Sequence, residues 1–392
     1  MSVQGYVHIG GRHARSTALR NVLAHAGLPL SEPMVFGLAG GIGAGYSFCP
    51  SVVRHGNGSG ISIVGRHKSY ATGPNWYTGI LDRLGVKYRI TESAAPKKAQ
   101  QNLRDELNAG RPAMVWCGRS KLTFMPNVVS ADLWMHEFAV YGVDDAKQLF
   151  IGSDRSNAPV TISFEALADA RNAVCTHKNR TLTIEPTKPA SPAKLREAVQ
   201  AALTACASEL LDGRMKTFSL PGLALWADRI ANTKNSKEGW PRVFGSGLMF
   251  DALLDAFDSI ETSGCGGGLF RPLFADFLAE AGHVSLAMTY RALGQQWTAL
   301  ADDLLPDRVV AFKKVKSALH KRDELFATKG QAADARIAAE VAKIASLTVD
   351  CRKSFPLDAA ATADHMGRLS DTIGELHRAE VAAAEALVRR TA

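Results

Sequence analysis

The sequence lacks the features of a membrane-spanning or secreted protein. No apolar run approaches the roughly 18–20 residues that a membrane-spanning helix needs. The first residues, MSVQGYVHIGG, do not show the basic-then-apolar pattern of a signal peptide. The six cysteines are scattered without paired spacing, which disfavours a disulfide framework. We therefore expect a cytoplasmic protein with reduced thiols and no membrane partner.

Motifs for metals, nucleotides and nucleic acids are also missing. His8, His13, His55 and His67 have no Cys-x-x-Cys or His-Glu-x-x-His companion, so we expect no metal site. The stretch FGLAGGIGAGY (residues 36–46) lacks the Gly-Lys-Ser/Thr ending of a phosphate loop, and a tyrosine stands where a dinucleotide motif has its third glycine. The basic residues do not cluster with interleaved aromatics, so nucleic acid is not the expected partner.

The composition is that of a globular protein with surplus positive charge. Hydrophobic residues make up 46% and charged residues 21% of the chain, which excludes wholesale disorder. The formal net charge of +8 suggests an acidic partner, such as an acidic carrier protein or an anionic cofactor. With 392 residues, the chain is too long for one ordinary core, and two domains are expected.

A proline-rich stretch, EPTKPASPAK at residues 185–194, separates two parts with different patterns. Three prolines in ten residues cannot continue a helix or a central strand, which indicates a linker. We expect a first domain at 1–186, a linker at 187–194 and a second domain at 195–392. Short β-type runs mixed with helices predict an α+β fold for the first domain. Apolar residues at three-to-four spacing predict a compact, mostly α-helical second domain.

The expected elements follow from these patterns. In the first domain, β-type runs occupy 60–65, 112–117, 136–143, 148–154 and 180–186, and helical periodicity occupies 16–26 and 98–109. In the second domain, helical periodicity occupies 195–213, 244–261, 269–282, 285–305 and 374–390.

The stretch GGRHARSTALRNVLAHAG (residues 10–27) predicts a turn that leads into a helix. Many enzymes place a nucleophile at a helix N-terminus, because the partial positive charge there stabilises an anion. The residue at this helix entrance is Ala14, which cannot attack a substrate. Taken alone, the stretch is an ordinary helix start.

The segment HEFAVYGVDDAKQLFIGSDR (residues 136–155) predicts a β-hairpin around the polar turn DDAK. If the turn is centred between the second Asp and the Ala of DDAK, His136 lies opposite Arg155 and one residue away from Asp154. A carboxylate beside an imidazole fixes its tautomer and stabilises the imidazolium. This register puts the side chains of His136 and Asp154 on opposite faces, so an odd-length turn or a β-bulge is needed to bring them together.

A nucleophile at a helix start, a histidine opening a strand about 100 residues later, and an aspartate ending the next strand follow the order of papain-like cysteine enzymes. On these positions, the chain resembles the butirosin-biosynthesis protein H family. The segments that carry the resemblance are HARSTALRNVLAHAGLPLSEPMVFGLAGGIGAGY (13–46), HEFAVYGVDD (136–145), the Asp-Arg pair at 154–155, ARNAVCTHKNR (170–180), and, in the second half, LALWADRI and GCGGGLFRPLFADFLAEA.

The resemblance implies a papain-like N-terminal domain, related to bacteriocin-processing cysteine peptidases, joined to a helical domain. It implies an acyltransferase of natural-product (antibiotic) biosynthesis, which moves an acyl or aminoacyl group from a carrier-protein thioester to an amine. The expected partners are an acidic acyl carrier protein and a small-molecule amine acceptor. The donor is then the phosphopantetheine arm of the carrier protein, and no cofactor is permanently bound. The assembly, a monomer or a homodimer, stays open.

The family's His-Cys-x-Ser/Thr pattern aligns with residues 13–16 (HARS), so Ala14 stands where the family has its nucleophilic cysteine. The resemblance makes His136 the general base and acid and Asp154 its orienting carboxylate. His8 lies six residues before Ala14, where the related peptidases have a glutamine that helps to form the oxyanion hole.

Four further residues are implied to bind substrate or line its channel: His13, Glu32, Gly41 and Tyr46. For Glu32 a turn or capping role is an equal alternative, and for Gly41 and Tyr46 plain packing is the stronger alternative. The segment GCGGGLFR (264–271) could approach a phosphate with its backbone amides, although a turn at a domain interface fits it better.

Three explanations compete for Ala14. In the first, the nucleophilic cysteine has been replaced deliberately, so that this chain is inactive. In the second, the chain is a naturally inactive relative that only binds. In the third, Ser16 or a cysteine from elsewhere in the chain, such as Cys49, supplies the nucleophile, although capping of the helix is the simpler role for Ser16. We favour the first, because His136 and Asp154 would have no chemical role in an inactive relative. Thioester hydrolysis, amide-forming cyclisation in the same fold, and non-catalytic binding in a biosynthetic assembly are the alternative functions.

Overall fold

The computed structural model describes residues 1–391 apart from 55–57, 67–75, 126–134, 175 and 214. It contains two compact units, whose segments alternate along the chain. The first unit comprises Met1–Val35, Ile80–Glu197 and Arg322–Ala339, and the second comprises Phe36–Gly79, Ala198–Lys321 and Glu340–Ala392. The predicted domains at 1–186 and 195–392 follow the sequence patterns and stay a prediction. The compact units divide the chain differently, because residues 36–79 belong to the second unit and residues 322–339 belong to the first.

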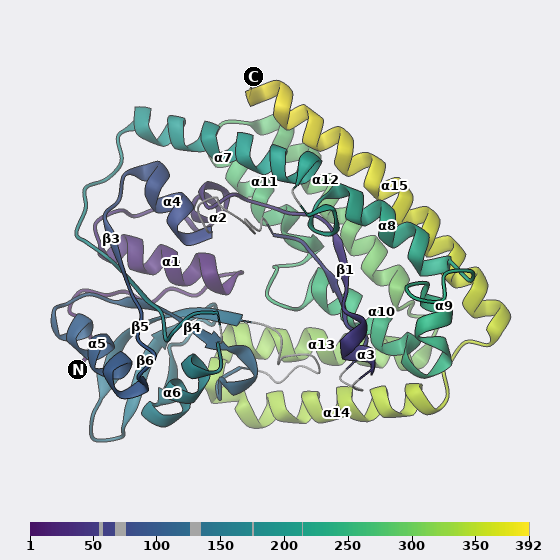
Figure 1. Ribbon diagram of the computed structural model, residues 1–392, viewed down its shortest axis with the longest axis horizontal. Coiled ribbons are helices and arrows are strands. Elements are labelled where there is room, and N and C mark those ends of the chain that lie inside the picture. Colours follow the sequence, from purple (N-terminus) through teal and green to yellow (C-terminus); the bar gives the residue numbers. More distant parts are fainter. Residues whose placement is uncertain (55–57, 67–75, 126–134, 175, 214, 392) are drawn as a thin grey trace. The chain divides into compact units, whose positions relative to one another are not determined.

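The first unit is built on a six-stranded sheet in the order β3-β8-β4-β5-β6-β7, and all neighbouring strands are antiparallel (Figure 1). Helices α1, α5 and α6 pack against its central strands, so these strands are buried along most of their length. The bounds are α1 Ala14–His25, β3 Tyr88–Thr91, α5 Pro96–Asn108, β4 Ala113–Gly118, η1 Arg119–Lys121, β5 Met135–Asp144, β6 Leu149–Ser153, β7 Val160–Ser163, α6 Phe164–Asn172 and β8 Thr181–Ile184.

Helix α1 shows how local sequence sets the element that carries Ala14. His13 is the N-cap, with extended backbone and a side chain that accepts from the N–H of Ser16. Leu19 and Leu23, one turn apart, are fully buried. Gly27, at φ +101°, ends the helix, because this left-handed conformation lets the next N–H, that of Leu28, reach back into the last turn.

The second unit is mostly helical and also contains a short hairpin, β1-β2. Its core includes the buried side chains of Tyr46, Trp226 and Trp297, which stack face to face. The bounds are β1 Tyr46–Phe48, α3 Pro50–Arg54, β2 Ile61–Ile63, α7 Pro192–Asp212, η3 Lys216–Phe218, α8 Leu220–Ala231, α9 Trp240–Val243, α10 Gly245–Glu261, η4 Gly268–Phe270, α11 Arg271–Glu280, α12 Val284–Leu304 and α15 Ala359–Thr391.

Five of the described helices contain residues of both units: α2 (Glu32–Leu38), α4 (Trp76–Leu84), α7, α13 (Val310–Lys329) and α14 (Asp334–Lys353). The 3₁₀ turn η5 (Gly330–Ala333), between α13 and α14, belongs to the first unit. In α13 the residues up to Lys321 belong to the second unit and the last two turns, from Arg322, belong to the first.

The predicted fold class is confirmed as a mixed α/β region with an antiparallel sheet, followed by a mostly helical region. The predicted strands and helices are present, most of them with small differences at their ends. The exception is the predicted helix at 374–390, because α15 already begins at Ala359. The predicted linker is too long by three residues, because Pro192 begins α7, where the first helical turn needs no proline N–H. None of the described helices is both long and apolar enough to cross a lipid bilayer.

Candidate active site

A β-bulge decides how His136 and Asp154 face each other. Near the turn Asp144 pairs with Leu149, so the register lies two residues from the predicted one, and the side chains would still face opposite ways. Between the pairs Gly142–Ile151 and Val140–Gly152, however, β5 advances two residues and β6 only one. The extra residue, Tyr141, forms the bulge whose need the sequence predicts.

Beyond the bulge the two side chains come to the same face of the sheet. Ala139 pairs with Ser153, so continuing this register places Asp154 opposite Phe138, and His136 lies two residues along on the same face. Nε2 of His136 lies 2.5 Å from Oδ2 of Asp154. This pair of residues is called the dyad below.

The dyad is almost completely buried. Asp154 is 0% exposed, and its Oδ1 accepts the backbone N–H of Arg155 at 2.6 Å. The His136 side chain keeps 11% of its surface exposed, and within the described part of the chain its Nδ1 has no hydrogen-bond partner. The Asp154 carboxylate can only accept a hydrogen bond, so the proton of neutral His136 lies on Nε2. The other ring nitrogen, Nδ1, is then the basic one.

Two opposing effects act on the Asp154 carboxyl. Burial raises its pKa, but the charge of His136, the hydrogen bonds from His136 and from the Arg155 N–H, and the Arg155 charge together hold the pKa below its ordinary value. Asp154 is therefore an anion at neutral pH and stabilises the imidazolium form of His136.

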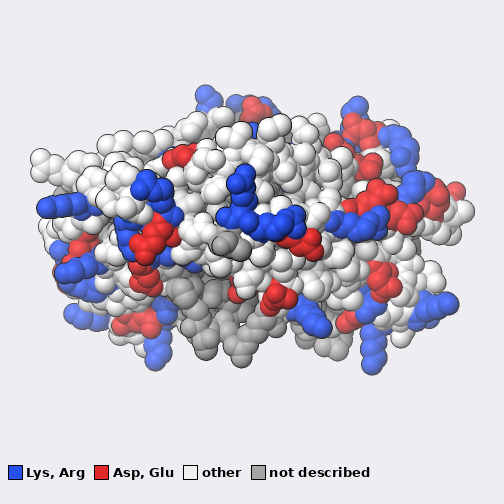
Figure 2. All heavy atoms as spheres, turned by 90° about the horizontal axis from the view of Figure 1, so that it is seen from above, with Lys and Arg blue, Asp and Glu red and all other residues white. Residues whose placement is uncertain are grey.

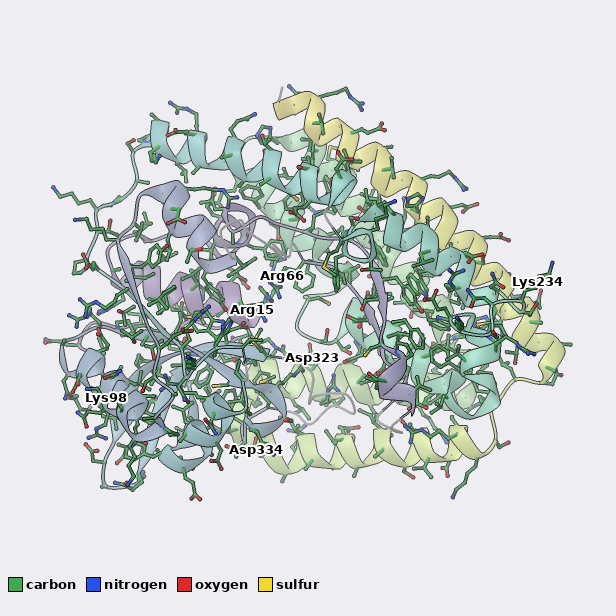
Figure 3. All side chains as sticks on the ribbon, viewed as in Figure 1. Arg15, Arg66, Lys98, Lys234, Asp323 and Asp334 are labelled. Carbon is green, nitrogen blue, oxygen red and sulfur yellow. The ribbon has the colours of Figure 1, made fainter. Side chains whose placement is uncertain are left out.

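The first turn of α1 lies against the start of β5. Arg15, which is labelled in Figure 3, directly follows Ala14. It donates from Nη2 to the carbonyl of Met135 and forms an ion pair with Glu137. Met135 and Glu137 are the two neighbours of His136 in the chain. Arg15 thus ties the helix turn that carries Ala14 to the strand start that carries His136.

The N-terminus of α1 leaves two backbone donors unused. His13 takes the N–H of Ser16 on Nδ1 and the N–H of Thr17 on its carbonyl. Among the described residues, the backbone N–H groups of Ala14 and Arg15 have no hydrogen-bond partner. Free N–H groups at a helix N-terminus can stabilise an oxyanion that forms beside them.

Glu32, predicted to bind substrate or shape a turn, lies buried beneath the N-terminus of α1. Its carboxylate accepts the backbone N–H groups of Arg12 and His13 and the hydroxyls of Ser16 and Thr17, at 2.8–3.1 Å. Glu32 thus fixes the loop that leads into α1, and this geometry corresponds to the capping alternative.

Among the residues near Ala14, several are engaged in such structural contacts. His13 is 6% exposed and caps α1, and Ser16 is fully buried with its hydroxyl bonded to Glu32. His8 lies beside Ser153 and Ser156, with Nδ1 2.7 Å from the Ser153 hydroxyl and Nε2 2.9 Å from the Ser156 carbonyl. Both ring nitrogens of His8 are therefore occupied.

Gly41, Tyr46 and Cys49 belong to the second unit, whereas Ala14 and the dyad belong to the first. A Cβ on Gly41 would lie 2.6 Å from the Phe274 ring, which makes the glycine necessary for packing. Tyr46 is 2% exposed and its hydroxyl accepts from Nε1 of Trp240 at 3.0 Å. These contacts correspond to the packing alternative for both residues.

Cys117 lies directly opposite His136 in the β4–β5 pair. Its side chain is 0% exposed, and burial raises the pKa of the thiol. A buried neutral thiol is a poor nucleophile, so Cys117 packs beside the dyad without an evident chemical role. In the described part of the chain, no three His, Cys, Asp or Glu side chains come together in a way that could hold a metal ion.

Two family models match consecutive parts of the chain. The N-terminal domain of butirosin biosynthesis protein H matches residues 13–155. This part of the chain is therefore an N-terminal domain of the butirosin biosynthesis protein H family. The matched domain begins at the N-cap of α1 and ends directly after Asp154, so it contains Ala14, Glu32 and the dyad. A domain of unknown function (DUF4872) matches residues 165–325. No curated protein matches the chain.

Figure 2 shows one face of the molecule coloured by charge. Among the described residues drawn there, most Lys and Arg side chains lie beside Asp or Glu side chains, with uncharged surface between these groups.

Proposed function

We propose that the first unit is built for cysteine-dependent acyl transfer, with position 14 as the nucleophile position and His136 and Asp154 as base and orienting carboxylate. It resembles a papain-like site in the order and roles of these three residues. The observation that carries the proposal is the hydrogen bond between Nε2 of His136 and Asp154, because it leaves Nδ1 of His136 as the basic nitrogen. Arg15 in turn connects the start of the His136 strand to the helix turn that contains Ala14.

With a cysteine at position 14, the first half of the reaction forms an acyl-enzyme. Nδ1 of His136 takes the thiol proton, and the sulfur attacks the carbonyl carbon of a thioester on a carrier protein's phosphopantetheine arm. The backbone N–H groups of Ala14 and Arg15 are placed to hold the oxyanion. The carbon–sulfur bond to the carrier breaks, and its sulfur leaves with the proton from His136.

In the second half, an amine acceptor attacks the acyl-enzyme. Nδ1 of His136 accepts the amine proton, the new carbon–nitrogen bond forms, and the enzyme sulfur leaves and is reprotonated by the imidazolium. Water or an internal amine in the acceptor's place gives hydrolysis or cyclisation. Because alanine has no nucleophilic atom, this chain should bind the donor without turnover. Replacement of a cysteine at position 14 accounts for an intact dyad beside a residue that cannot react.

Mass spectrometry of the intact Ala14→Cys protein tests the proposal. After incubation with acyl-loaded carrier protein, we expect the mass of one acyl group on the protein, mapped by peptide digestion to position 14. The unaltered chain and an Ala14→Cys/His136→Ala double variant are the controls, and neither should gain the group. Addition of an amine should release the group as an amide.

An Ala14→Cys protein that gains no acyl group from a donor active in a positive control contradicts acyl transfer. Carrier protein that binds the unaltered and the Ala14→Cys chain equally, without transfer to either, supports a binding protein instead. Release of free acid, unchanged by amines, supports hydrolysis.

A further inference from the structure

One face of the C-terminal end of α13 packs against the loop that follows the dyad carboxylate. Asp323 and Phe326 contact the Arg155 side chain, and the carbonyl of Ala327 accepts the N–H of Asn157 at 2.7 Å. Just beyond the helix, the side-chain oxygen of Gln331 accepts the N–H of Thr161 at 2.6 Å, and its amide donates to the Thr161 carbonyl.

The contacting residues share one side of the helix, because positions 323, 326 and 327 follow three-to-four spacing. All of these contacts lie within the first unit. Asp323, Phe326, Ala327 and Gln331 are called the α13 face below.

Arg155 connects the α13 face to both parts of the candidate site. Its backbone N–H donates to Oδ1 of Asp154, and its carbonyl accepts the N–H of Gly11, in the loop before α1, at 2.9 Å. Its guanidinium pairs with Asp323 and lies 4.8 Å from the centre of the Phe326 ring. The Arg155 side chain is 9% exposed, so it is held between these groups.

We propose that Asp323 and Phe326 are positioning residues for the dyad, which act through Arg155. The inference rests on the proposed function of His136 and Asp154 and extends it to residues outside the matched butirosin biosynthesis protein H domain. The α13 face holds the Arg155 guanidinium away from the adjacent carboxylate, so that Asp154 keeps Oδ2 for Nε2 of His136.

Electrostatics gives the reason why the guanidinium has to be held. Arg155 is the next residue after Asp154, and its charge already lowers the pKa of that carboxyl. An Arg fork pairs strongly with a carboxylate when both are shielded from water. Once Asp323 no longer holds it, the guanidinium competes with His136 for Asp154. His136 then loses its partner on Nε2, and the Nδ1–H tautomer becomes populated.

NMR of ¹⁵N-labelled histidine in the full chain tests the inference without any acyl substrate. In the unaltered protein we expect His136 in the Nε2–H tautomer. In Asp323→Asn, which keeps size but removes the charge, we expect the second tautomer, with the proton on Nδ1, to appear in a substantial share of the molecules. Asp323→Glu should restore the original spectrum. Phe326→Leu provides a second variant in case Asp323→Asn does not fold.

A matched control is Asp276→Asn, which breaks another Arg–Asp pair, with Arg291, in the second unit. It should leave His136 unchanged. In the Ala14→Cys background, Asp323→Asn should also slow acyl-enzyme formation about tenfold, with a shifted pH profile.

A folded Asp323→Asn protein with the His136 tautomer of the unaltered chain overturns the inference, even if its melting temperature falls. Because the spectrum does not depend on turnover, it decides the role of Asp323 separately from acyl transfer. A spectrum that changes while no acyl-enzyme forms on any Ala14→Cys protein supports the positioning role and contradicts the proposed function alone.

Discussion

Nε2 of His136 and Oδ2 of Asp154 lie 2.5 Å apart only because β5 contains one residue more than β6 between its hairpin turn and the dyad. That residue, Tyr141, changes the face on which every earlier side chain of β5 lies. A substitution that removes the charge of Asp154 but keeps the shape of its side chain therefore tests the dyad directly.

In the Ala14→Cys background, Asp154→Asn should lower the rate of acyl-enzyme formation by about 100-fold or more, because an amide can present its N–H to Nε2 and leave the proton on Nδ1. Rapid-quench kinetics with intact-mass detection measures the rate. The matched variant is Asp145→Asn, an exposed carboxylate in the hairpin turn, which should keep the original rate. Equal rates for the two variants would contradict the role of Asp154.

Stability at acid pH should depend on the same carboxyl. The folded pKa of Asp154 lies below its ordinary value of about 3.9, so this group stabilises the fold above pH 4, and that contribution is lost as the pH falls through the folded pKa. Urea unfolding between pH 6 and pH 3 should show a shallower loss for Asp154→Asn than for the unaltered chain. Parallel curves would be inconsistent with a low pKa.

Asp255 on α10 should change the pH dependence of stability in the opposite direction to Asp154. Burial, moderated by the hydroxyl of Ser59 at 2.5 Å and reinforced by the charges of Asp251 and Asp258, raises its pKa to about 7. Because this value lies above the unfolded one, the group's contribution is fully present below about pH 4 and is lost as the pH rises through 7.

We expect Asp255→Asn to raise the unfolding free energy at pH 8, relative to the unaltered chain, by on the order of 1 kcal/mol more than at pH 5. Chemical unfolding at both values measures it, with exposed Asp276→Asn as the control. A pH-independent difference would argue against a raised pKa.

Glu32 should stabilise the fold rather than bind substrate. It affects the candidate site only because it fixes the N-terminus of α1. Glu32→Ala leaves two backbone N–H groups and two hydroxyls without their shared acceptor, which should cost about 3 kcal/mol of unfolding free energy. Glu32→Gln keeps one oxygen and should cost less than half of that. Calorimetry or urea unfolding separates the two variants, and equal losses would show that the acceptor role is not what matters.

Replacement of Gly41 should lower the stability of the second unit. In Gly41→Ala, the new Cβ meets the Phe274 ring and φ is +67°, so a loss of about 2 kcal/mol is expected. Acyl-enzyme formation by the Ala14→Cys protein should be unchanged per folded molecule. A selective loss of donor binding at full stability would restore the substrate-channel interpretation.

The sequence predicts the parts of the site that depend on local pattern. Alternation marks the strands that carry His136 and Asp154, apolar spacing marks α1, and the odd register of the hairpin calls for a bulge or an odd turn. Which of the two occurs depends on tertiary packing, and no residue type in the segment marks Tyr141 as the extra residue.

Other features depend on contacts between segments distant in sequence. A glutamate in LSEPMVFGL is compatible with a turn, and only the fold brings it under Arg12 and His13. Asp323 lies 168 residues from Arg155, in helix α13, which is not among the helices predicted from the sequence. The Asp-Arg pair at 154–155 gives a local indication of this contact. When Asp154 is bonded to His136, a buried Arg155 needs a second carboxylate to balance its charge.

The reactivity of a thiol at position 14 tests the central claim most directly, because it needs no substrate. In the Ala14→Cys protein, alkylation by iodoacetamide should proceed at pH 6 within about threefold of its rate at pH 8, since the helix start and His136 hold the thiolate. His136→Ala should slow the reaction at pH 6 at least tenfold. Alkylation with the pH dependence of an ordinary thiol, pKa about 8.5, and no response to His136→Ala would contradict a nucleophile position facing the dyad.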